Sequence, residues 1–100
     1  MVYLVRTVEF LKFDSSLEEK MTKLFEHFGK SYPQIKGIKF LMNITGPINQ
    51  SHMVFKFDSL ADEETWATSV IKDDIYLDFL KASEGITTPG VDHLYREFSM

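Results

Sequence analysis

A chain of 100 residues with 44% hydrophobic and 14% aromatic residues is too apolar to be disordered, and we expect one domain over residues 1–100. Its net charge of −4 and pI of about 5.3, without a run of lysines or arginines, argue against a nucleic-acid or membrane-surface binder, because those partners attract cationic faces. The absence of cysteine excludes disulfides, thiolate catalysis and zinc–sulfur sites.

The expected location follows from the apolar runs. The N-terminal segment reaches Arg6 and Glu9 too early to form the apolar core of a signal peptide. No uninterrupted apolar run approaches the roughly 20 residues of a membrane helix. We therefore expect a cytoplasmic protein with no membrane partner and no nucleic-acid partner.

The first strand-like run is Val2–Lys12, which is rich in β-branched and aromatic residues. Both of its faces are largely apolar, with one charge on each. A sheet that helices cover on one side only usually has a polar second face. We therefore expect something to cover the second face of this sheet as well.

An amphipathic helix is expected over Ser15–Phe28. A capping box is expected at Ser15 or Ser16, each followed three residues later by a glutamate, and Gly29 is the expected C-cap. The apolar stripe recurs at helical spacing. It consists of Leu17, Met21, Leu24, Phe25 and Phe28.

Three further strand-like runs follow, at Ile38–Ile44, His52–Phe57 and Val91–Phe98. The first two are separated by Gly46-Pro47, which predicts a turn between them. In each of the first two, apolar residues alternate with a more mixed set. This alternation predicts one buried face and one mixed face on these strands.

A second helical stretch is expected over Leu60–Ala82, beginning at Asp58 or Ser59. The sequence Lys72-Asp73-Asp74 interrupts its apolar spacing, so we expect a break or kink near Asp73. The resulting order, β-α-β-β-α-β, is the ferredoxin-like α+β plan with an antiparallel sheet. This order constrains the fold, but no segment carries a self-sufficient catalytic signature.

Four segments resemble the dimeric α/β barrel superfamily, and the resemblance covers nearly the whole chain. Leu4-Val5-Arg6-Thr7 is similar to the NIPSNAP-type opening, and YPQIKGI at 32–38 to the strand-two entry of the stress-responsive barrel and antibiotic-biosynthesis-monooxygenase groups. HMVFKFDSL at 52–60 and DIYLDFL at 74–80 are similar to segments shared by all of them. The resemblance implies a homodimer whose sheets pack face to face into a barrel. It does not resolve the member family.

The superfamily includes cofactor-independent monooxygenases acting on phenolic or polyketide substrates, haem-degrading enzymes, small isomerases and proteins with no known reaction. Trp66 resembles the helix-two tryptophan of the haem-degrading group. That group also has an asparagine in strand one and a histidine ligand late in helix two; this chain lacks both, and Tyr76 is a poor substitute for the histidine. We interpret Trp66 as a core anchor, and we expect no cofactor and no metal ion.

The three histidines are His27, His52 and His93, and no pair has metal-ligand spacing. Each is suited to act as acid, base or ligand, or is an ordinary, partly exposed histidine. His27 lies near a helix end, where a positive charge is favourable. His52 lies on the mixed face of its strand and is the best functional candidate of the three.

A pocket is expected if the mixed faces of the strands turn inward, because an apolar interior with a few convergent polar groups is typical of small-molecule sites. Either Arg6 or Glu9 joins it, depending on which face of the first strand turns inward. The same groups suit a plain interface equally well. The ligand-pocket candidates are Arg6, Lys39, Asn43, His52, Trp66 and Tyr76.

Two functions remain open at this stage. The favoured one is a binding protein that holds a small, largely apolar ligand in a pocket beside the sheet. The alternative is a cofactor-independent monooxygenase or isomerase acting on a small aromatic or polyketide-like substrate. In that case His52 would accept a proton, while Arg6 or Lys39 would stabilise the developing negative charge.

Overall fold

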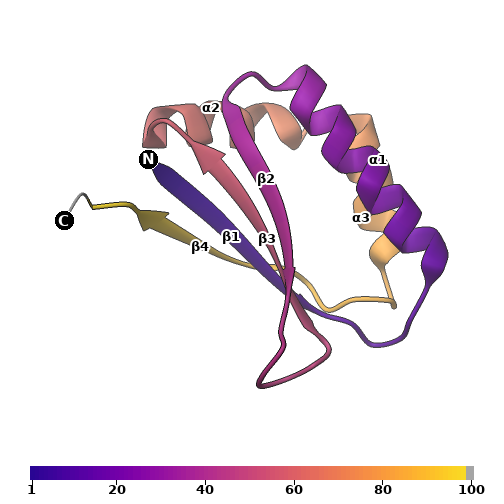
Figure 1. The fold of residues 1–100 in the computed structure, drawn as a ribbon. Helices are drawn as coiled ribbons and strands as arrows, with labels where there is room; N and C mark the ends of the chain where they lie inside the picture. Colours follow the sequence, from indigo (N-terminus) through magenta and orange to yellow (C-terminus); the bar gives the residue numbers. More distant parts are fainter. Residues whose placement is uncertain (99–100) are drawn as a thin grey trace.

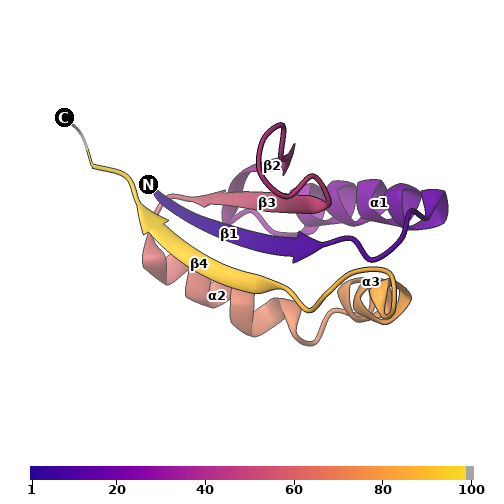
Figure 2. The same ribbon diagram turned by 90° about the horizontal axis from the view of Figure 1, so that it is seen from below.

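The computed structural model describes residues 1–98 and shows the expected ferredoxin-like α+β architecture (Figure 1). Along the chain the elements are β1 Val2–Glu9, α1 Ser15–Ser31, β2 Ile35–Met42, β3 Gln50–Phe57, α2 Leu60–Val70, α3 Asp74–Ser83 and β4 Val91–Arg96. The strands form one antiparallel sheet in the order β2-β3-β1-β4. Figure 2 shows the twist of this sheet, with β2 and β4 at its edges.

The helices lie on one side of the sheet, and the core lies between the two layers (Figure 1). Phe55 and Phe57 of β3 pack against Trp66 of α2, with ring centroids 5.3 and 5.6 Å apart. Trp66 is only 1% exposed, so its interpretation as a core anchor is confirmed. Across residues 1–98, the helices are too short or too polar to cross a lipid bilayer.

The ends of α1 differ from the expectation. The side chain of Asp14, rather than that of Ser15 or Ser16, caps the helix by accepting a hydrogen bond from the Ser16 backbone N–H at 2.9 Å. The expected C-cap at Gly29 is also wrong, because the helix continues through it to Ser31. The helix ends where Pro33 follows Tyr32, since a residue before proline avoids the helical conformation.

The break in the second helical stretch is confirmed. Helix α2 begins after its N-cap, Ser59, and ends at Val70, whereas α3 begins at Asp74. The side chain of Asp73 caps α3 by accepting hydrogen bonds from the backbone N–H groups of Ile75 and Tyr76, at 3.0 and 3.3 Å. The interruption in apolar spacing therefore marks a real boundary between two helices.

The strand ends also differ in detail. β1 stops at Glu9, short of Lys12, and β4 stops at Arg96, short of Phe98. β2 begins earlier than expected, at Ile35, and its pairing with β3 shifts register between Ile35 and Gly37. Burial alternates as expected along β3, whereas every residue of β4 is exposed, so the strand register assigns the two faces of the sheet there.

The second face of the sheet, which we call the open face, lies on the side away from the helices. The strand register assigns His52, Thr7 and Val5 to it. Its larger apolar side chains are Tyr3, Val5, Leu41, Val54, Val91 and Tyr95. Within the described part of the chain, no helix covers this face.

Candidate ligand site between the sheet and the helices

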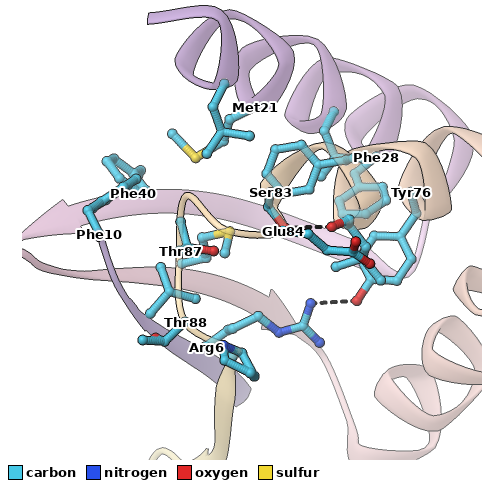
Figure 3. A pocket seen from close by; sticks show the side chains of 18 of the residues that line it. Arg6, Phe10, Met21, Phe28, Phe40, Tyr76, Ser83, Glu84, Thr87 and Thr88 are labelled. Carbon is cyan, nitrogen blue, oxygen red and sulfur yellow. Dashed lines mark hydrogen bonds between the residues drawn. The ribbon is translucent and has the colours of Figure 1, made fainter. Parts of the chain in front are cut away.

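A cavity of about 520 Å³ lies between the sheet, α1, α3 and the loop that leads into β4 (Figure 3). We call it the sheet–helix cavity. Most of its wall is apolar, because the strands and helices around it turn apolar side chains towards the cavity. The sheet contributes Val8, Phe40 and Met53, and α1 contributes Leu17, Met21 and Leu24.

One end of this cavity is polar and is built around Arg6 of β1. Its Nη1 atom donates a hydrogen bond to the hydroxyl of Tyr76 at 2.6 Å. Its Nε and Nη2 atoms donate to the two carboxylate oxygens of Asp92, at 2.7 and 3.0 Å. Burial alone lowers the pKa of Arg6, but Asp92 and Tyr76 outweigh that effect and hold the pKa above its ordinary value. Arg6 is therefore a fixed cation.

The fold brings these three residues together from distant parts of the chain. Arg6 and Asp92 are cross-strand partners in the β1–β4 register, which places both side chains on the helix face. Tyr76 lies in the first turn of α3, where Asp73 holds its backbone N–H. A Cβ atom at Gly90 would lie 2.8 Å from Cδ of Arg6, so only glycine lets the loop approach this closely.

The loop between α3 and β4 forms the remaining wall of the cavity, with Ser83, Glu84, Thr87 and Thr88 in its lining. Its backbone is tied to the end of β1. The Thr88 backbone N–H donates to the Glu9 carbonyl at 2.8 Å, and the Glu9 N–H donates to the Thr88 hydroxyl at 2.9 Å. The wall is thus fixed to the same strand that carries Arg6.

A second cavity, of about 630 Å³, lies beside the first and is called the outer cavity here. The outer cavity is lined by the β1–α1 loop, α1, β2 and the loop after β2. Phe13 and Ile48, which are 85% and 79% exposed, are part of its lining. Four residues line both cavities: Phe10, Leu17, Met21 and Phe40.

His52 and Asn43 lie on the open face, away from both cavities. The Nε2 atom of His52 is 2.8 Å from the Asn43 side-chain oxygen, and its Nδ1 atom is 2.8 Å from the Thr7 hydroxyl. The Asn43 amide nitrogen donates to the Pro47 carbonyl, so its oxygen is the acceptor for His52. The Nε2 atom of His52 is therefore placed to donate to Asn43, and its Nδ1 atom is within hydrogen-bond distance of the Thr7 hydroxyl. Both ring nitrogens are engaged within the chain.

The six pocket candidates are therefore divided by the sheet. Arg6 and Tyr76 line the sheet–helix cavity together. Lys39 lies on the open face with His52 and Asn43, as the β2–β3 register shows. Trp66 lies in the core and is not part of the cavity lining. Glu9, the alternative to Arg6, lies on the open face.

The sequence reasoning missed the loop residues Glu84, Thr87 and Thr88, and it missed Asp92 as the partner of Arg6. Gly85, Pro89 and Gly90 identify this stretch as a loop, but no spacing rule places a loop against a given strand. The Arg6–Asp92 pair depends on the register between the first and last strands. A register of this kind is decided by tertiary packing rather than by local pattern.

A second polar cluster joins α1, α3 and the chain entering β2. The Nε2 atom of His27 lies 2.7 Å from a carboxylate oxygen of Asp73, and the Tyr32 hydroxyl donates to the same oxygen. Burial and Asp73 together raise the pKa of Tyr32 to about 12. Burial alone raises the pKa of Asp73, but the hydrogen bonds from Tyr32 and His27 lower it below its ordinary value.

This cluster includes a serine, because the Ser31 hydroxyl lies 3.2 Å from Nδ1 of His27. The order serine–histidine–aspartate is that of a hydrolase triad. However, Ser31 is exposed on the last turn of α1, and within residues 1–98 neither cavity is lined by any of the three. We interpret the cluster as a tie between helices. Among the same residues, no group of three or more histidine, aspartate or glutamate side chains is placed to hold a metal ion.

Comparison with known proteins identifies the fold. No protein-family model matches the sequence, and no curated protein matches it. Among solved structures, SnoaB, a cofactor-independent oxygenase from Streptomyces nogalater, is similar with a TM-score of 0.75 and 11% identity, over 99% of this chain and 94% of that one. A NIPSNAP domain protein from Burkholderia xenovorans is similar with a TM-score of 0.68 and 13% identity, over 99% and 96% of the two chains.

A NIPSNAP family protein of unknown function from Agrobacterium tumefaciens is similar with a TM-score of 0.65 and 19% identity, over 95% and 86% of the two chains. These structures share the ferredoxin-like α+β fold of this chain. At these identities the likeness establishes the fold and leaves the member family unresolved.

Proposed function

We propose that this chain is a small-molecule-binding protein that holds a small, largely apolar ligand in the sheet–helix cavity. The observation that carries the proposal is the pairing of Arg6 with Tyr76 at one end of an otherwise apolar cavity of about 520 Å³. Apolar walls with a few fixed polar groups are the usual composition of a ligand pocket. We further propose that the protein works in the cytoplasm, as first expected from its sequence.

The binding proposal is tested with a neutral fluorescent probe, Nile red, and two matched variants of α3. Leu80 lines the cavity, whereas Leu77 does not, and the two are exposed to a similar extent, 39% and 43%. We expect Leu80→Trp to fill the cavity and weaken Nile red binding, while Leu77→Trp binds as the wild type does. Equal affinity in both variants, or no saturable binding to the wild type, contradicts the proposal.

Native mass spectrometry of the purified protein adds an independent test. We expect a complex heavier than the bare polypeptide, and denaturing mass spectrometry of the same sample then identifies the compound released. A small apolar compound that is lost in Leu80→Trp but kept in Leu77→Trp supports the cavity as its site. A compound retained by both variants places the ligand elsewhere.

We also propose that the protein is a homodimer whose two sheets pack through their open faces. The support is the composition of this face, which carries Leu41 and Val91 with 49% and 57% of their surface exposed, together with the half-buried Val5 and Val54. Covering such side chains removes apolar surface from water, which favours association. The fold shared with the dimeric α/β barrels is consistent with this arrangement.

The second candidate function is a cofactor-independent monooxygenase or isomerase acting on a small aromatic or polyketide-like substrate. The Arg6–Tyr76 hydrogen bond favours it, because Arg6 holds the Tyr76 hydroxyl in place and leaves its hydrogen free to be donated to a substrate oxygen. SnoaB, which has the same fold, is a cofactor-independent oxygenase. Arg6 and His52 lie on opposite faces of the sheet, so one site on one face does not use both.

The enzyme candidate is tested by oxygen consumption with an anthrone probe, dithranol, which oxidises slowly without a catalyst. We expect the wild type to accelerate the reaction and Tyr76→Phe to slow it, while His52→Ala remains active. A rate equal to that of buffer alone rejects the oxygenase candidate. This result leaves the binding proposal intact, since Nile red measures binding separately.

A further inference from the structure

We infer that the ligand is an elongated amphiphile with a neutral, hydrogen-bond-accepting oxygen at one end, held by Tyr76, and an apolar tail that extends under α1 into the outer cavity. This inference rests on the proposed binding function and specifies the ligand class. It combines two observations: a buried hydroxyl that accepts a hydrogen bond but does not donate one, and a wall shared by the two cavities.

The Tyr76 hydroxyl is the contact that we assign to the head group of the ligand. Its oxygen accepts a hydrogen bond from Nη1 of Arg6, so its own hydrogen remains to be donated. Among the contacts within residues 1–98, this hydroxyl has no acceptor, although Tyr76 is only 8% exposed. Figure 3 shows the hydroxyl and the guanidinium facing each other at the cavity. Because this hydroxyl faces the cavity, an acceptor oxygen on a bound ligand is placed to receive its hydrogen bond.

The charges around the hydroxyl favour a neutral acceptor. Arg6 is the one cation in the lining of the sheet–helix cavity within the described residues, and both oxygens of Asp92 already neutralise it. Glu84 adds a negative charge to the same lining. A carboxylate or phosphate head group would enter without an available positive charge, which is unfavourable away from bulk water. A ketone, ester or amide oxygen meets no such penalty.

The four residues that line both cavities form the wall that the tail of the ligand would cross. All four are apolar. Met21 is unbranched and changes conformation easily, so the wall between the two cavities can rearrange around a ligand. Beyond it, Phe13 and Ile48 leave most of their surface in water. An apolar chain lying there would cover both side chains and extend the contact begun in the first cavity.

The head-group test compares three probes with the same chain length: dodecane, 2-dodecanone and dodecanoate. We expect Tyr76→Phe to lower the affinity for 2-dodecanone about tenfold, which is the effect of one lost hydrogen bond. The affinity for dodecane should not change, because the aromatic ring remains. We expect dodecanoate to bind the wild type more weakly than 2-dodecanone. If Tyr76→Phe changes ketone and alkane equally, or if dodecanoate binds tightest, the head-group assignment is wrong.

The tail test uses two matched variants in the loop between β2 and β3. Ile48 lines the outer cavity, whereas Ile44 does not, and both are highly exposed, so neither substitution threatens the core. We expect Ile48→Asp to lower the affinity for 2-dodecanone severalfold and to leave the affinity for the shorter 2-hexanone unchanged. Ile44→Asp should change neither affinity. Equal loss for the long and short ketones overturns the tail assignment.

These outcomes are distinguishable from failure of the binding function itself. If the wild type binds neither dodecane nor Nile red, the proposed function fails and the ligand class falls with it. If it binds both and the substitutions of Tyr76 and Ile48 have no selective effect, the function stands and this inference is overturned. Thermal melting of each variant shows that the comparisons are made on folded protein.

Discussion

Arg6 donates a hydrogen bond to the hydroxyl of Tyr76 across 70 positions of sequence, over a distance of 2.6 Å. This contact joins the central strand β1 to the start of α3 at the polar end of the sheet–helix cavity. The backbone of Tyr76 is held in turn by Asp73, which caps the same helix. The position of the Tyr76 phenol therefore depends on Arg6 of β1, on the cap at Asp73 and on Gly90, which lies against Arg6. The last two are tested by substitution below.

We expect Gly90→Ala to destabilise the protein by about 1–3 kcal/mol, as overpacking does. The new methyl group would lie 2.8 and 2.9 Å from Cδ and Cγ of Arg6, so the arginine must move away from Asp92 and Tyr76. Urea unfolding measures the change. Gly29→Ala is the control, because nothing lies within 4 Å of its added methyl group. Since Gly29 is inside α1, that variant should gain about 0.5–1 kcal/mol.

We expect Asp73→Ala to cost about 2–4 kcal/mol, because it removes both the cap of α3 and the acceptor for His27 and Tyr32. Asp73→Asn should cost less, since asparagine is also a good N-cap. Asp74→Ala, one residue later and exposed, should cost well under about 1 kcal/mol. If Asp73→Ala and Asp74→Ala lower the free energy of unfolding equally in chemical denaturation, the contacts of Asp73 between the helices contribute nothing to stability.

The acid side of the stability profile follows from the lowered pKa of Asp73. A carboxylate with a depressed pKa stabilises the fold above its unfolded pKa of about 4, and this contribution is lost as the pH falls through the folded value. We expect the difference in free energy of unfolding between wild type and Asp73→Asn to shrink as the pH falls below about 4. A difference that stays constant with pH would disprove the charge-assisted tie.

Tyr32 predicts a change at the alkaline end. Its pKa is about 12 in the folded protein, against about 10 in the unfolded chain, so the folded state holds its proton more tightly. This contribution is complete below about pH 10 and is lost as the pH rises towards 12. We expect the stability advantage of wild type over Tyr32→Phe to disappear across that range in thermal melts. A stability difference between wild type and Tyr32→Phe that stays constant from pH 10 to 12 would contradict this assignment.

The proposed dimer predicts a change in mass with a single charge on the open face. Leu41→Asp places a carboxylate where two sheets would meet, and we expect it to shift the protein from dimer to monomer in analytical ultracentrifugation. Ile71→Asp changes another exposed apolar residue, after α2 and away from the open face, and should leave the mass unchanged. A wild type that sediments as a monomer at micromolar concentration rejects the dimer.

Much of the fold follows from local pattern, as Asp73 shows. Two aspartates after a lysine interrupt the apolar spacing, and the structure places a helix boundary there. The alternation on β3 likewise predicted which residues are buried. Capping at Asp14 was missed because several adjacent side chains offer an acceptor, and local spacing does not decide between them.

The site was less predictable. Arg6 and Tyr76 were identified as candidates, but so were Lys39, Asn43 and His52, which lie on the opposite face. The two groups separate only when the face of β1 is known, and both of its faces are largely apolar. The wall formed by the loop before β4 depends on hydrogen bonds to the end of β1, and these are long-range contacts that no local pattern encodes.

The division of the second helical stretch at Asp73 also sets the dimensions of the molecule. An unbroken helix over residues 60–83 would be roughly 36 Å long, whereas a strand of eight residues such as β1 spans only about 27 Å. The surplus would project past the end of the sheet with its apolar side unsupported. Turning the chain at Asp73 folds that surplus back against α1. The division therefore leaves α2 over the sheet and makes α3 one wall of the sheet–helix cavity.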